Sequence, residues 1–200
     1  MENKTGLEYL KDGRAENAIY NFNNVLTKYS DVSAQWIRAK FLKGMAYELE
    51  GRYNESLKMF KEVLVRYPKM PYLEHLDSAL VETEIGIIYH RLGKKEEAAR
   101  TWRTVVEKYP DSHSTLVANY LLGKLTAEEL RTQLSQKQIS GMYFSYLEYL
   151  AGLKSQMDGK LEEAKKYYQK CIELSEGRGI YYQQAKKELE TLNLAGNKDI

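Results

Sequence analysis

The sequence contains little of the residue types from which disulfides, metal sites and membrane anchors are built. Cysteine occurs once, at Cys171, so an intrachain disulfide is excluded. Histidine occurs three times, at His75, His90 and His113, without the clustered spacing of a zinc site. No run of about 18 apolar residues is present, which a membrane-spanning helix would need. The sequence therefore predicts neither a metal centre nor direct membrane insertion.

An excess of charge of one sign is also lacking. The chain has 30 lysines and arginines against 28 aspartates and glutamates, for a net charge of +2. A balance of this kind gives no long-range attraction to nucleic acid or to an anionic membrane. Apolar residues make up 43% and charged residues 29%, which is typical of a globular chain rather than a disordered one.

Proline is scarce, and alternating strand patterns are missing. The three prolines, Pro68, Pro71 and Pro110, all fall between segments with helical periodicity. Apolar residues recur at spacings of three and four along the whole chain, which is the pattern of amphipathic helices. The sequence therefore predicts an all-α fold.

The chain does contain one residue pattern that occurs four times. Residues 51–68 read GRYNESLKMFKEVLVRYP, and residues 93–110 read GKKEEAARTWRTVVEKYP. Residues 13–30 and 159–176 repeat the same residue types at the same offsets. A recurring supersecondary unit of this kind buries its apolar face by stacking on its neighbours.

Each copy follows a helical segment that has a glycine in its interior. Gly44 is followed three residues later by Tyr47, and Gly86 stands in the same relation to Tyr89. Glycine in a helix interior costs about 1 kcal/mol relative to alanine, so its presence needs a reason. We expect close approach of the paired helix to supply that reason.

These residues resemble the tetratricopeptide repeat, a helix–turn–helix unit of about 34 residues. The signature positions are Gly44, Tyr47, Ala98, Trp102 and Pro110. The resemblance implies a right-handed superhelical solenoid of antiparallel helix pairs that ends in a C-terminal capping helix. The longer repeats and the KYPD ending are similar to those of bacterial cell-envelope members of the family. That likeness favours a bacterial periplasm or cell envelope, with a leader absent from this chain; a cytoplasmic location is the alternative.

The landmarks predict a single solenoid over residues 1–194. The repeats are expected at 1–32, 37–70 and 79–112, a degenerate one at 113–138, a further one at 145–178, a capping helix at 180–194, and a tail at 195–200. In the degenerate repeat, the second helix is expected to begin at Thr126, where TAEE has the form of a capping box.

Catalytic residues are not predicted. The glutamate pairs at 96–97, 128–129 and 162–163 fall in first turns of expected helices, where negative charge is favoured. No phosphate-binding loop, dinucleotide fingerprint or nucleophile elbow occurs. Cys171 occupies a small core position of the repeat, which predicts a buried, inert thiol. The chain is therefore expected to need no cofactor, and an enzyme would require residues from several repeats to converge in one pocket.

In the tetratricopeptide-repeat family, the first helices of successive repeats line a concave groove that binds a partner peptide or helix. Carried onto this chain, the groove residues are Leu7, Leu10, Phe41, Met45, Ile87, His90, Tyr146, Tyr149 and Leu153. This apolar set suits a peptide or an amphipathic helix of another protein. The sequence leaves open whether the face is free, or covered by neighbouring helices or by a second copy in a homo-oligomer.

Overall fold

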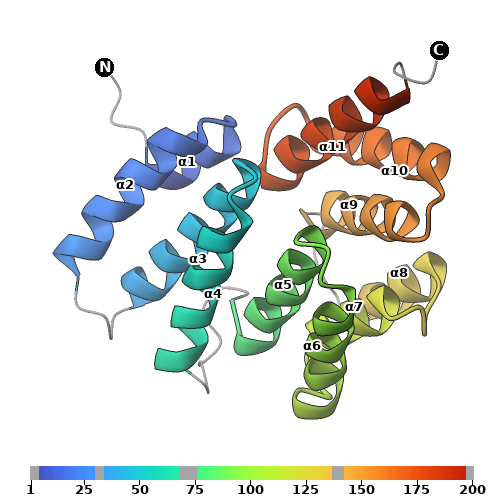
Figure 1. Cartoon of the computed structure of the whole chain (residues 1–200), viewed down its shortest axis with the longest axis horizontal. Helices are drawn as coiled ribbons and strands as arrows, with labels where there is room; N and C mark the ends of the chain where they lie inside the picture. The colour runs from blue at the N-terminus through green and yellow to red at the C-terminus, as the bar shows by residue number, and fades with distance from the viewer. Residues whose placement is uncertain (1–4, 30–33, 68–75, 137–141, 197–200) are drawn as a thin grey trace. The chain divides into compact units, whose positions relative to one another are not determined.

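The computed structural model describes residues 5–29, 34–67, 76–136 and 142–196, most of which lie in helices (Figure 1). Parts of the predicted repeats and most of the predicted tail at 195–200 lie outside these ranges, as do Pro68 and Pro71. The chain forms two compact units. Unit 1 comprises Met1–Leu10 and Arg14–Thr126, and unit 2 comprises Lys11–Gly13 and Ala127–Ile200.

Unit 1 is a series of antiparallel helices, each packed against the next. Its helices are α1 (Gly6–Lys11), α2 (Ala15–Lys28), α3 (Ala34–Leu49), α4 (Tyr53–Arg66), α5 (Ser78–Arg91), α6 (Lys95–Lys108) and α7 (His113–Leu121). Helix α3 packs against α2 and α4, and α5 packs against α4 and α6. Asp77 caps α5, because its carboxylate accepts a hydrogen bond of 2.7 Å from the Leu80 amide.

Unit 2 contains the last helix pair and the helix that covers it. Its helices are α8 (Ala127–Gln136), α9 (Met142–Met157), α10 (Leu161–Leu174) and α11 (Ile180–Gly196). Helices α9 and α10 form the pair, and α11 packs against both of them. The all-α fold of antiparallel helix pairs is confirmed, with a last helix where the sequence predicts the cap.

The turn between the two helices of each pair is built in the same way. A glycine with φ between 74° and 76° ends the first helix at Gly13, Gly51, Gly93, Gly123 and Gly159. The next amide then bonds back to the first helix, as from Arg52 N to Tyr47 O at 2.8 Å and from Lys94 N to Tyr89 O at 2.9 Å. This is the Schellman arrangement, and a side chain at the glycine would be strained.

In α1, α3, α5 and α9, a glycine inside the helix lies directly against an aromatic ring of the helix that follows. A Cβ on Gly86 would lie 2.2 Å from Nε1 of Trp102, far inside any van der Waals contact. The equivalent distances are 2.7 Å for Gly6 and Phe22, 2.5 Å for Gly44 and Phe60, and 2.5 Å for Gly152 and Tyr168. The predicted close approach is confirmed, and Ala98 beside it is completely buried.

The degenerate repeat keeps the turn but not the close contact. Helices α7 and α8 are joined at Gly123, and Lys124 N bonds to Asn119 O at 2.8 Å. Leu116 stands where the other first helices have glycine, and Thr132 stands where the other second helices have a ring. The division between the two units falls inside this repeat, after Thr126.

Two carboxylates from neighbouring first helices are buried in unit 1. Glu48 of α3 and Glu84 of α5 are 5% and 2% exposed, and Oε1 of Glu84 has no hydrogen-bond partner among the described residues. Burial, and then repulsion from Glu48, raise the pKa of Glu84 well above its ordinary value. Glu84 is therefore held as the neutral acid well above the pH at which an exposed glutamate ionises.

A third buried carboxylate is neutralised in a different way. Glu148 of α9 is 3% exposed, and its Oε1 lies 2.8 Å from Nη2 of Arg131 in α8 and 3.2 Å from Nζ of Lys170 in α10. Removing one member of such a buried ion pair leaves an uncompensated charge, which is strongly destabilising. This ionic cluster therefore holds α8 to the helix pair of unit 2.

We expect Gly86→Ala to lower the free energy of unfolding by about 1–3 kcal/mol, because the added methyl overlaps Trp102. Helix propensity alone predicts the opposite sign, a gain of about 1 kcal/mol. Urea denaturation followed by circular dichroism measures the difference. In a Trp102→Leu background the cost should shrink, because the smaller side chain leaves room. A free energy that is unchanged or higher for Gly86→Ala alone would contradict this account of the glycine.

The buried acid predicts a pH dependence of stability. Unfolded Glu84 loses its proton near 4.5, whereas the folded protein retains it to higher pH, so its contribution to stability falls as pH rises above that value. We expect the melting temperature of Glu84→Gln, minus that of the wild type, to grow between about pH 5 and pH 8. Glu48→Gln should produce a smaller change of the same sign. It removes the repulsion from Glu48, but it leaves Glu84 buried, and burial is the larger cause of the raised pKa. Parallel pH profiles for Glu84→Gln and the wild type would refute the buried neutral acid.

Candidate functional site

The acidic pairs that resemble catalytic carboxylates lie on solvated helix ends. Residues 96–97, 128–129 and 162–163 are all exposed, in the first turns of α6, α8 and α10. No three histidine, cysteine, aspartate or glutamate side chains of the described ranges gather closely enough to hold a metal ion. Within those same ranges, no helix has both the length and the apolar character needed to cross a bilayer. The acidic pairs are thus placed as the structural interpretation predicts.

The single thiol belongs to the core of unit 2. Cys171 of α10 is fully buried, and its Sγ lies 3.6 Å from the carbonyl oxygen of Tyr181 in α11. Burial raises the pKa of Cys171 to about 12, so the thiol stays protonated. The prediction that Cys171 is buried is confirmed, and the raised pKa agrees with an unreactive thiol.

The groove residues predicted in unit 1 fall into two classes of exposure. Leu10, Met45 and Ile87 are at most 1% exposed, whereas Leu7, Phe41 and His90 are partly exposed. The Phe41 ring also packs on Phe60 of α4, with ring centroids 5.3 Å apart. In unit 1 the accessible part of the predicted set is therefore one residue from each of α1, α3 and α5.

His90 is uncharged at neutral pH. Burial lowers its pKa, and the positive charges of Arg91 and Lys95 lower it further. The imidazole therefore adds a neutral, amphipathic surface beside the apolar side chains.

The groove residues predicted in unit 2 are all buried. Tyr146, Tyr149 and Leu153 are 4%, 2% and 1% exposed. The ring of Tyr181 in α11 covers both tyrosines, with centroid distances of 4.5 Å to Tyr146 and 5.6 Å to Tyr149. The capping helix thus occupies this face of α9, and a role for these three residues in partner binding stays a prediction.

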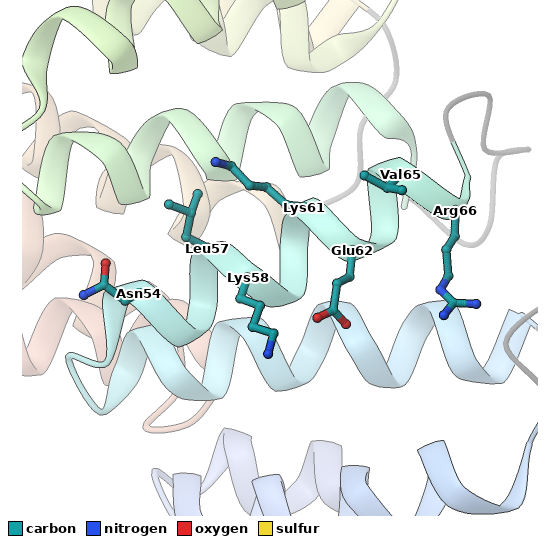
Figure 2. Close-up of a pocket in the computed structure, with 7 residues that line it drawn as sticks. All are labelled: Asn54, Leu57, Lys58, Lys61, Glu62, Val65 and Arg66. Atoms are coloured by element: carbon teal, nitrogen blue, oxygen red, sulfur yellow. The ribbon is translucent and has the colours of Figure 1, made fainter.

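A surface that the sequence reasoning did not single out lies on α4. A shallow, open hollow, here named the α4 trough, is lined by Asn54, Leu57, Lys58, Lys61, Glu62, Val65 and Arg66. Figure 2 shows these side chains in two rows along the helix, with Lys58, Glu62 and Arg66 on one side and Leu57, Lys61 and Val65 on the other. The available signal was the local excess of basic residues around α4, which the near-zero net charge of the whole chain conceals.

Comparison with protein families gives three matched segments, all described as tetratricopeptide repeat. They cover residues 38–69, 84–112 and 158–178. The first two contain α4 and α6 with most of the helices that precede them, and the third contains α10. A search of curated proteins finds no match.

Solved structures with a similar chain path were also found. A tetratricopeptide repeat protein from Parabacteroides merdae ATCC 43184 is 15% identical, over 94% of this chain and 76% of that one, with a TM-score of 0.47. MamA from Desulfovibrio magneticus RS-1 is 17% identical, over 96% of this chain and 88% of that one, with a TM-score of 0.44.

The three matched segments agree with the helix pairs, the glycine turns and the glycine–ring contacts of the structure itself. Residues 38–69, 84–112 and 158–178 of the chain are therefore tetratricopeptide repeats, which are non-enzymatic protein-interaction modules.

Proposed function

We propose that the chain is a scaffold that binds a peptide or an amphipathic helix of a partner protein along the first helices of unit 1. The proposal rests on side chains that occupy equivalent repeat positions in successive first helices. Met45 of α3 and Ile87 of α5 occupy the same repeat position, as do Glu48 and His90 one turn later. We expect side chains at equivalent positions of successive repeats to lie along one strip.

The strip has a buried floor and a partly exposed rim. Met45 and Ile87 are the floor, and Leu7, Phe41 and His90 are the rim. Phe41 offers an aromatic contact, and His90 is neutral because its pKa is lowered. Apolar and aromatic anchors of this kind provide most of the binding energy when a helix lies in a groove.

Site-specific photo-crosslinking tests the proposal without deleting packing residues. A photoreactive phenylalanine derivative placed at Leu7 or at His90 should crosslink a partner protein in lysate of the source cells, because both positions lie on the rim. The same derivative at Lys166, an exposed position on α10, is the matched control. Circular dichroism establishes that the three labelled proteins fold alike.

The mass of the crosslinked product distinguishes a partner protein from a second copy of the chain. A product from Leu7 and His90 that is absent from Lys166 supports a partner on the first-helix strip. A product of twice the chain mass from the same two positions would instead favour self-assembly through this face. Equal products from all three positions, or none from the two rim positions, would contradict the proposal.

A further inference from the structure

The stretch of the chain that forms α3 and α4 has an excess of positive charge. Residues 34–67 contain seven lysines and arginines against four glutamates, so this stretch has a net charge of +3, while the whole chain has +2. The rest of the chain is therefore slightly negative. Charge complementarity directed at one face requires such a local imbalance.

Most of the nearby glutamates are already engaged. Glu62 bonds to Lys40 at 2.6 Å, Glu55 bonds to Arg52 at 2.8 Å, and Glu48 is buried. Lys58 and Lys61, both exposed on α4, have no carboxylate partner among the described residues, and the Lys61 ammonium lies 5.2 Å from the ring centre of Tyr89. Two cations of the α4 trough are thus available to an external anion.

Crowding of like charge extends to the neighbouring helix. Lys43 of α3 has a lowered pKa, first because of burial and then because of repulsion from Lys40, Arg52 and Lys58. Its Nζ bonds to the amide oxygen of Asn23 at 2.6 Å, which is a neutral partner. The surface beside the trough is therefore positive.

The trough also has an apolar component. Val65 is 81% exposed, and Leu57 is partly exposed on the same row of α4. Eight residues of helix separate the two side chains by about 12 Å, a little over two turns. A partner helix with apolar residues two turns apart matches that spacing.

We propose that the α4 trough docks an acidic amphipathic helix of a partner protein, whose apolar residues contact Leu57 and Val65 and whose carboxylates pair with Lys58 and Lys61. Along α4, Leu57 and Val65 lie on either side of Lys58 and Lys61, and so small a set of cations favours this occupant over nucleic acid, which requires a longer run of cations and stacking rings. The site is independent of the first-helix strip, because its residues lie on the second helix of the pair.

The test uses the full chain and two labelled synthetic peptides in fluorescence anisotropy. Each peptide has three heptads with leucine at the first and fourth positions; the remaining positions are glutamate in one peptide and lysine in the other. We expect saturable binding of the acidic peptide alone. Lys58→Glu with Lys61→Glu should weaken it by about tenfold or more, and Val65→Ser should weaken it severalfold.

The matched control is Lys166→Glu with Lys186→Glu, which changes the net charge equally at exposed positions of unit 2. Circular dichroism establishes that all variants are folded. Equal weakening by the control pair, or no saturable binding of the acidic peptide, would overturn the proposal. Tighter binding of a single-stranded oligonucleotide than of the acidic peptide would overturn it in favour of nucleic acid. A wild-type dimer that dissociates in the Lys58→Glu, Lys61→Glu variant would identify a second copy as the occupant instead.

Discussion

The contact between a helix glycine and an aromatic ring determines how the two helices meet in every described pair except α7 and α8. Four pairs use it, and the ring changes from Phe22 and Phe60 to Trp102 and Tyr168 while the glycine does not change. Phenylalanine, tryptophan and tyrosine can all occupy the ring position. At the glycine position, by contrast, any side chain would place a Cβ where the ring already lies. Each such glycine costs about 1 kcal/mol of helix propensity. The close packing it permits must outweigh that cost, because burial of a large ring contributes more.

The degenerate repeat shows the consequence of losing this contact. Its turn is intact at Gly123, so the chain still reverses direction, but Leu116 and Thr132 replace the glycine and the ring. The boundary between the two units lies there. Within unit 2, α8 is held instead by Glu148 and its two cations. Shape complementarity is thus replaced by a buried ionic cluster, whose strength depends on every member being present.

The fold could be predicted because a glycine and an aromatic residue recur at the same spacing in four repeats, although most of the other residues differ between those repeats. The turn at Gly123 lacks the sequence signature of the other turns, because Leu116 and Asn119 stand where a glycine and usually a tyrosine precede it elsewhere. The candidate site was less predictable, since equivalence between repeats locates a side chain on a helix face but not what packs over it. Tyr149 is buried by Tyr181, a contact between helices that no local pattern encodes. Likewise, nothing local to Glu84 indicates that its carboxyl group is buried beside Glu48.

The two proposed surfaces of unit 1 differ in physical character, and this difference has consequences for a scaffold. The first-helix strip is apolar and neutral around Phe41 and His90, so the proposed binding there would depend little on salt. The α4 trough relies on Lys58 and Lys61, whose attraction is screened over roughly 10 Å at 0.1 M ionic strength. If both proposed surfaces bind partners, salt would release a partner from the α4 trough and leave a partner on the first-helix strip. Where one partner engages both surfaces, the second contact forms at the high effective concentration that the first contact creates. Modest affinity at each surface then suffices for a stable complex.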